Sequence, residues 1–200
     1  MNLFDTHAHY DADAFDGDRD QVLSGLADRG VALVVNPGCD LTSSRTAVAL
    51  AEKYPFLYAA VGYHPENCGP YVPEDLDALR ALAKCPKAVA IGEIGLDYHW
   101  EDNPSRELQR RVFRDQLALA EELDLPVIVH DRDAHAESLR LIRAFPRVRG
   151  VFHCFSGSAE MARELVGLGW MVSFTGVLTY KNARRALEAA AAVPLERVMI

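Results

Sequence analysis

Short apolar runs rich in Val, Ile and Ala alternate along the chain with longer segments in which apolar residues recur at helical spacing. The short runs predict buried strands, and the longer segments predict amphipathic helices that pack against them. Such alternation is typical of βα units, whose strands run parallel in one sheet. The predicted strands cover residues 2–4, 31–35, 57–61, 88–91, 127–129, 150–152, 171–174 and 197–200. The predicted helices cover residues 19–29, 42–54, 73–83, 105–123, 134–145, 159–168 and 182–192.

Eight predicted strands and seven predicted helices indicate a single α/β domain, residues 1–200, folded as a (β/α)₈ TIM barrel. Asp, Ser or Thr residues precede several predicted helices, and Gly30 and Gly169 follow two of them, as expected at helix ends. A TIM barrel typically runs to about 250 residues and ends with an eighth helix. The run Arg-Val-Met-Ile200 reads as the opening of a buried strand. We therefore expect a barrel truncated within or just after its eighth strand, with its C-terminal end missing.

Composition favours a globular protein over disordered, membrane-spanning and disulfide-rich proteins. The sequence is 50% hydrophobic and 25% charged, which indicates one globular core rather than disorder. No apolar run approaches the about 18 residues of a membrane span, and no signal peptide is recognisable, so no membrane partner is expected. The four cysteines form no Cys-x-x-Cys pair, which favours a reducing cytoplasm over a disulfide framework or a zinc ribbon. A net charge of −8 argues against wrapping of nucleic acid by a basic face, so a nucleic-acid substrate would need bound cations.

Metal-binding side chains follow the predicted strands. His7-Ala-His9 comes after the first strand, and residues two apart on extended backbone face the same side. Other strand ends carry Glu93, His130 and His153. Because the carboxyl ends of the strands share one mouth of a TIM barrel, these five residues converge in the predicted fold. Imidazoles and a carboxylate suit zinc, manganese or iron, and the carboxylate leaves magnesium open.

Four histidines and a glutamate are more ligands than one catalytic metal uses, since a position must stay open for water or substrate. Two divalent ions are therefore predicted, with Glu93 between them. One ion would face His7 and His9, and the other would face His130 and His153. Taken singly, each residue could instead be a surface group or an ordinary hydrogen-bonded residue. Their repetition at four strand ends favours the metal site.

The segments around these residues resemble, in the same order, those of the TatD-like family of metal-dependent DNases. They are residues 4–9, 61–65, 91–98, 126–130 with 132–134, 152–157, and 173–176 with 181–182. The resemblance implies a barrel hydrolase that cleaves phosphodiester bonds of nucleic acid, often from the 3′ end, with two divalent cations. It implies metal ligands at the same five residues, and a phosphate contact at His64.

Two departures from the family pattern stand out. The family's last strand ends in a Thr-Asp-x-Pro-like segment, whose aspartate binds metal and orients or deprotonates the attacking water. We expect that general base just beyond Ile200. Asp131 stands where relatives frequently carry serine, and we expect it to add negative charge near the phosphate path.

Several further residues have two readings. Asp5 is predicted to fix a histidine tautomer from the second shell, with a turn role as the alternative. Lys181 and Asn182 follow the seventh strand, where TIM barrels often bind phosphate, or they form a solvated helix start. For Cys154, packing is favoured over a nucleophilic role, because neighbours on a strand face opposite sides. The aromatic loop 98–100 can stack on bases or act as a lid.

We therefore predict a divalent-metal-dependent hydrolase of nucleic-acid phosphodiesters, a TatD-like deoxyribonuclease acting 3′ to 5′ on single-stranded DNA ends by a metal-activated water. Glu93 is its predicted catalytic residue, and Mg, Mn or Zn its predicted metal. One alternative is a related hydrolase of an ester, amide or lactone, such as an aminoacyl ester, because fold analogy does not separate these reactions. The other is an inactive, truncated metal-binding scaffold.

Overall fold

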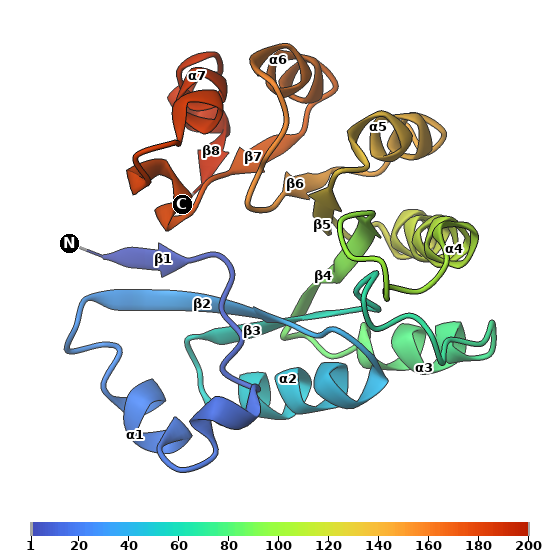
Figure 1. Ribbon diagram of the computed structural model, residues 1–200. Helices are drawn as coiled ribbons and strands as arrows, with labels where there is room; N and C mark the ends of the chain where they lie inside the picture. Colours follow the sequence, from blue (N-terminus) through green and yellow to red (C-terminus); the bar gives the residue numbers. More distant parts are fainter. Residues whose placement is uncertain (1, 200) are drawn as a thin grey trace.

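The computed structural model describes residues 2–199, in which eight parallel strands follow one another in chain order across one sheet. The strands are β1 (Leu3–Asp5), β2 (Val31–Pro37), β3 (Leu57–Val61), β4 (Ala88–Asp97), β5 (Val127–Arg132), β6 (Gly150–Phe152), β7 (Met171–Ser173) and β8 (Val198–Met199). The sheet curls around a central axis and carries its helices on the outside (Figure 1). The predicted α/β TIM-barrel class is confirmed.

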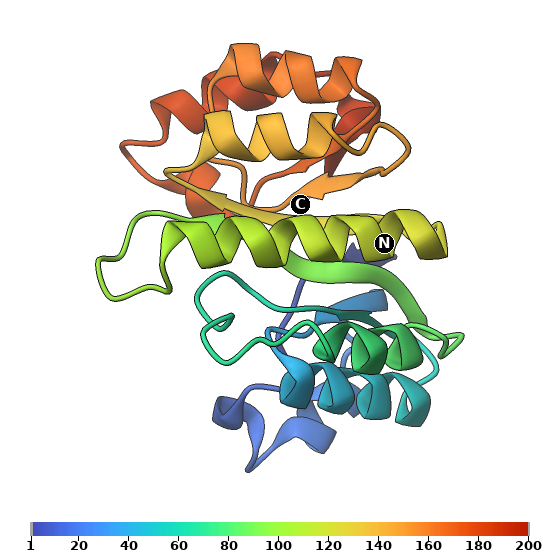
Figure 2. The ribbon, with the colours of Figure 1, turned by 90° about the vertical axis from the view of Figure 1, so that its right-hand side faces the viewer.

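Helices connect the strands and cover the outer face. They are α1 (Arg19–Ser24), α2 (Leu41–Lys53), α3 (Asp75–Leu82), α4 (Arg106–Leu123), α5 (His135–Arg143), α6 (Ala159–Gly167) and α7 (Arg184–Ala191), with 3-10 turns η1 (Asp13–Phe15), η2 (Gly176–Thr179) and η3 (Leu195–Arg197). Helices α3, α4, α5 and α6 lie side by side (Figure 2). The predicted cap signals are confirmed at Asp40, Ser105 and Ser158, whose side chains accept backbone N–H groups of the first helical turn. None of the described helices is long and apolar enough to cross a membrane.

Strands β4 and β5 extend well beyond their predicted ends at residues 91 and 129. Their ladder continues through Gly95, Leu96 and Asp97, which pair with residues 130–132 of β5. Polar and glycine residues stay in these strands because the neighbouring backbone satisfies their hydrogen bonds. Helix α1, in contrast, ends at Ser24, before its predicted end at residue 29. A series of turns begins at Gly25, a residue type that disfavours helix.

Two separate apolar cores result. The larger lies between the strands and the helices and includes Leu57, Ile91 and Phe113, all fully buried. A smaller one, formed by Val35, Ala60, Ala90 and Ile128, comes from the adjacent strands β2 to β5. Alternate residues of β2 to β5 thus fill the barrel, while their neighbours hold the helices.

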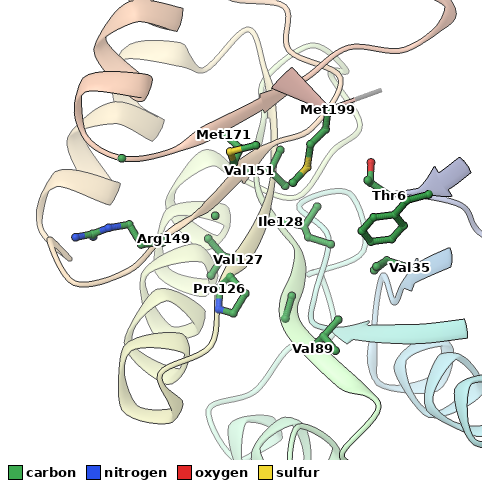
Figure 3. Close-up of a pocket in the computed structure, with 14 residues that line it drawn as sticks. Thr6, Val35, Val89, Pro126, Val127, Ile128, Arg149, Val151, Met171 and Met199 are labelled. Carbon is green, nitrogen blue, oxygen red and sulfur yellow. The ribbon is translucent and has the colours of Figure 1, made fainter. Parts of the chain in front are cut away.

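The barrel interior widens into an apolar cavity of about 290 Å³ (Figure 3). Phe4 and Met199, from the first and last strands, both line it, although within residues 2–199 no hydrogen-bonded ladder joins β1 to β8. Ala90, Val127 and Met171 line it at the beginnings of their strands. The cavity therefore lies toward the amino ends of the strands, opposite the mouth where the predicted ligands converge.

Candidate metal centre

The segment after β1 carries two histidines to the mouth of the barrel. Ala8 N–H donates to Val35 O at 3.1 Å, which ties this segment to β2. The imidazoles on either side of Ala8 then meet, with His7 Nε2 3.0 Å from His9 Nε2. Behind them, His9 Nδ1 lies 3.9 Å from Asp11 Oδ1, and Asp11 is held by the buried Asn36 amide on β2 at 2.7 Å. His7 Nδ1 is buried without a hydrogen-bond partner in the described part of the chain.

Glu93 occupies the centre of the cluster, inside strand β4. Its backbone N–H donates to Gly38 O at 2.9 Å, and its residue is only 4% exposed. One carboxylate oxygen, Oε2, lies 3.1 Å from His7 Nε2 and 3.7 Å from His9 Nε2. The other, Oε1, lies 3.3 Å from His130 Nδ1 and 4.0 Å from His64 Nε2. The carboxylate thus faces a different pair of imidazoles with each oxygen.

The close approach of β4 to β5 depends on Gly95. Its φ of +142° is one that L side chains rarely adopt, and a Cβ at this position would lie 1.9 Å from His130 O. No other residue type fits there without displacing the strand that carries His130. The glycine therefore sets the spacing between Glu93 and His130.

His64 lies beside the cluster in a tautomer that disfavours ligation. His64 follows the end of β3, and its backbone N–H donates to Cys39 O at 2.9 Å. Its Nδ1 accepts the backbone N–H of Glu66 at 3.2 Å. Because a neutral imidazole carries one proton, Nε2 of His64 is then the N–H donor. The ring presents a donor to the mouth of the barrel rather than a lone pair.

His153 follows β6 and packs against the first histidine pair. Its ring stacks on that of His7, with centroids 3.5 Å apart and an interplanar angle of 9°. Its Nδ1 lies 3.2 Å from Ser173 Oγ, which also accepts the N–H of Cys154 at 3.2 Å. All five predicted ligands therefore meet at one mouth of the barrel.

Burial and neighbouring charges raise the pKa of two histidines of the cluster and lower the pKa of two others. Burial by itself raises the pKa of Glu93, but hydrogen bonds from its histidine neighbours hold this pKa well below the usual value. Burial lowers the pKa of His9 and of His130, yet hydrogen bonds that include Glu93 outweigh it and raise these pKa values to about 10 and about 9. Burial lowers the pKa of His64 and of His153 to about 4. The carboxylate thus attracts positive charge on both of its sides.

The donor set fits divalent cations. Two imidazole nitrogens 3.0 Å apart, such as those of His7 and His9, need a proton or a cation between their lone pairs. Nitrogens at about 2.1 Å from one ion and at right angles lie about 3 Å apart. Ligand atoms of His7, His9 and Glu93 lie within 4.8 Å of one another. Those of Glu93 and His130 also lie within 4.8 Å of each other, whereas the neighbouring His64 presents an N–H there rather than a lone pair. Imidazole and carboxylate are ligands that zinc, manganese and iron share.

Residues 4–200 match the protein family described as "TatD related DNase". The chain belongs to this family. The uncharacterized metal-dependent hydrolase YabD of Bacillus subtilis is 40% identical over 200 residues, covering 99% of this chain and 78% of YabD. The 3′-5′ ssDNA/RNA exonuclease TatD of Cronobacter turicensis is 36% identical over 195 residues, covering 96% and 73%. The crystal structure of the TatD homologue YjjV of Escherichia coli has a TM-score of 0.91 at 35% identity, covering 99% and 77%.

Membership of the TatD family makes this chain a metal-dependent hydrolase. The structure also shows the surroundings of three further residues near the site, Asp5, Asp131 and Cys154. Asp5 accepts the backbone N–H of His7 at 3.3 Å, which is the turn role and not a contact to the ring. Asp131, expected to add negative charge near the phosphate path, neighbours His130 on β5 and so faces the opposite side of the strand, where it lies 2.8 Å from His135 Nδ1. Cys154 is not on a strand, since β6 ends at Phe152; it lies in a turn with φ of +46°.

The remaining candidates of this TatD-family chain lie on loops. Lys181 is exposed and makes no hydrogen bond or ion pair within residues 2–199, so its phosphate role stays a prediction. Tyr98 turns outward, where its hydroxyl lies 3.1 Å from Glu137 Oε2. Trp100 is 51% exposed, with the Arg132 guanidinium 5.2 Å from its ring centroid. Of the aromatic loop, Trp100 alone is both exposed and stacked with a cation.

Sequence reasoning missed one buried carboxylate of the centre, Asp97. His130 Nε2 lies 2.8 Å from Asp97 Oδ2. Burial raises the pKa of Asp97, but hydrogen bonds from His130 and from the backbone of His99 outweigh it and lower this pKa to about 2. The signal was present, because Asp97 is four residues after Glu93 on one strand and so shares its face.

Proposed function

We propose that this protein hydrolyses phosphodiester bonds of nucleic acid and releases nucleotides from the 3′ ends of single-stranded DNA, using two divalent cations. The observation that carries the proposal is the two-sided Glu93 carboxylate, whose oxygens face His7 and His9 on one side and His130 on the other. A carboxylate between two histidine groups suits a pair of ions, the arrangement used for displacement at phosphorus. The name of the Cronobacter relative, a 3′-5′ ssDNA/RNA exonuclease, supports this substrate class.

Each side chain has a part in this proposal. His7, His9 and Glu93 Oε2 would hold one ion, Glu93 Oε1 and His130 would hold the other, and His153 stays a predicted ligand. Bound divalent ions would supply neutralisation of phosphate charge and lower the pKa of water. The Nε2–H of His64 would donate to a phosphate oxygen at the same mouth.

The loop after β4 offers a surface for the nucleobase. Asp97 binds both the His99 backbone N–H, at 2.9 Å, and the His130 ring, so this loop lies directly beside the cluster. The exposed Trp100 ring and the Arg132 guanidinium combine an aromatic face with positive charge. Single-stranded nucleic acid is bound in this way, by base stacking and charge without sequence preference.

We expect Trp100→Ala to raise KM for a single-stranded oligonucleotide on the order of tenfold, with little change in kcat, because base stacking contributes about 1–3 kcal/mol per base. Trp100→Phe keeps an aromatic face and should stay close to the wild-type KM. Steady-state kinetics on one labelled oligonucleotide measure both. A fall in kcat at constant KM would instead place Trp100 outside substrate binding.

The proposed function is tested by digestion of 3′-labelled single-stranded DNA with Mn²⁺ or Mg²⁺ and with EDTA. We expect nucleotide release with metal and none with EDTA. His130→Ala should lower the rate of release at least about a hundredfold, because removing a metal ligand should reduce activity no less than removing a residue that hydrogen-bonds to a ligand. His135→Ala is the matched control, since His135 also pairs with a buried aspartate but lies on the outer face. Activity that survives both EDTA and His130→Ala would refute the proposal.

The rival reaction is hydrolysis at a carbon centre, which barrels of this type also perform. The same preparations should therefore be offered a carboxylic ester and a lactone beside the oligonucleotide. Metal-dependent turnover of those compounds, with none of the oligonucleotide, would move the assignment to that class while leaving the metal centre in place.

A further inference from the structure

Asp97 is fully buried at the far side of the His130 ring. The ring lies between two carboxylates, with Nε2 2.8 Å from Asp97 Oδ2 and Nδ1 3.3 Å from Glu93 Oε1. Glu93 belongs to the metal centre. Asp97 has no assigned part in the proposed function, and its ring contact is the shorter of the two.

The hydrogen-bond chemistry determines which nitrogen of His130 carries the proton. An ionised carboxylate only accepts, so the contact to Asp97 requires Nε2–H as the donor. In the neutral ring, Nδ1 then keeps its lone pair and directs it toward Glu93. A lone pair and a carboxylate oxygen 3.3 Å apart repel unless a proton or a cation lies between them. A divalent ion held by His130 and Glu93 would remove this repulsion.

Asp97 is itself held rigidly. Gln109 binds its backbone on both sides, donating to its carbonyl at 2.9 Å and accepting its N–H at 2.8 Å. The second carboxylate oxygen, Oδ1, accepts the backbone N–H of His99 at 2.9 Å and the side-chain amide of Asn103 at 3.1 Å. The other oxygen, Oδ2, lies 2.8 Å from His130 Nε2.

We propose, on the basis of the metal centre in the proposed function, that Asp97 is a positioning residue that holds His130 in the Nε2–H tautomer and so presents Nδ1 as the metal ligand. Histidine ligands typically donate their second N–H to such a partner, and loss of that partner costs about 10–100-fold in metal affinity. Among the described residues, none of the three other histidine ligands has an equally close carboxylate behind it. Asp11 lies 3.9 Å from His9 Nδ1, His7 Nδ1 has no partner, and His153 Nδ1 lies 3.2 Å from a hydroxyl, that of Ser173.

Asp97→Asn should invert this arrangement. His99 N–H and the Asn103 amide both donate to the Oδ1 position, so the substituted side chain must present its oxygen there and its NH₂ group to His130. That NH₂ group opposes Nε2–H and favours the other tautomer. We expect Zn²⁺ affinity, measured by calorimetry with a competing chelator, to fall about 10–100-fold.

Asp131→Asn is the matched control. It removes another buried carboxylate bonded to a histidine at 2.8 Å, one residue from His130 but on the opposite face of β5. Its Zn²⁺ affinity should equal that of the wild type, and thermal unfolding of both variants without metal reports any structural damage separately. Equal affinity of Asp97→Asn and the wild type would overturn the positioning role.

A second measurement needs no variant. In the wild-type protein loaded with Zn²⁺, ¹⁵N NMR of the imidazoles should show His130 bound through Nδ1 with Nε2 protonated, and ligation through Nε2 would overturn the inference. Failure here is distinct from failure of the proposed function. Zn²⁺ bound as expected without cleavage of DNA would refute the function alone, and cleavage with unchanged affinity of Asp97→Asn would refute the inference alone.

Discussion

Replacing Glu93 with Gln is expected to remove nucleic-acid hydrolysis together with tight metal binding. The carboxylate contacts His7 and His130 with different oxygens, so its loss affects both sides of the centre at once. Removal of one stabilising group from an active site commonly costs about 10²–10³-fold in kcat. Because Glu93 also supplies the buried negative charge that attracts the cations, the loss in kcat/KM should exceed about a thousandfold. Metal titration and oligonucleotide digestion measure the two effects.

Glu101→Gln is the control for charge, since Glu101 is exposed on the loop after β4 and makes no hydrogen bond or ion pair within the described range. It should retain both metal affinity and activity. Circular dichroism of Glu93→Gln should show a folded protein, because the imidazoles around residue 93 can remain neutral. A Glu93→Gln protein that keeps wild-type metal stoichiometry and rate would rule out the two-sided carboxylate as the basis of the chemistry.

The beginnings of strands β2 to β7 and the ends of β3 and β6 were predicted correctly, whereas β2, β4 and β5 run beyond their predicted ends. Strands β2 to β7 each begin at the predicted residue, because apolar runs mark where the chain enters the barrel. At the carboxyl ends, β4 continues through Glu93 and Asp97 and β5 through His130, where polar residues replace apolar ones. Hydrophobic patterning reads that change as the end of a strand, whereas the ladder to the neighbouring strand carries the backbone onward. These ends are also where the candidate site lies.

The predicted ligand residues converge. Their hydrogen-bond partners, however, depend on strand extents and backbone contacts that the hydrophobic pattern of the sequence does not reveal. Ending β4 at residue 91 hid the shared face of Glu93 and Asp97. The same rule of alternation, applied to Asp131 beside His130, would have directed it outward, where it meets His135. The tautomer of His64 follows from a backbone contact to Glu66, which residue types alone do not reveal.

The apolar cavity shows why position in the barrel is needed to interpret a pocket. Several of its lining residues, among them Val127 and Ile128, come from the beginnings of strands, where TIM barrels carry stability rather than chemistry. The candidate metal centre lies at the other ends of the strands, where polar residues and glycine replace apolar ones. The same strands thus contribute to stability at their beginnings and to the candidate site at their ends. Substitution of Gly95 is expected to affect both.

Gly95→Ala is expected to destabilise the fold and to disrupt the metal centre together. The added Cβ would lie 1.9 Å from His130 O, and the φ of +142° is strained for any L side chain. Steric strain and displaced backbone at such a site cost about 3 kcal/mol or more in the free energy of unfolding. For a domain of this size, that corresponds to a fall in Tm of about 6–12 °C. Because the clash pushes β5 away from Glu93, Zn²⁺ affinity should fall in the same variant.

Gly167→Ala provides the matched control. Gly167 ends helix α6, is exposed, and has no heavy atom within 4 Å of a Cβ built on it. Alanine there should leave Tm unchanged or raise it slightly, because glycine in a helix is less favourable than alanine by about 0.5–1 kcal/mol. Thermal unfolding and Zn²⁺ titration of the two variants separate the explanations. If Gly95→Ala unfolds at the wild-type temperature and binds Zn²⁺ normally, β4 and β5 do not need the close approach that joins Glu93 to His130.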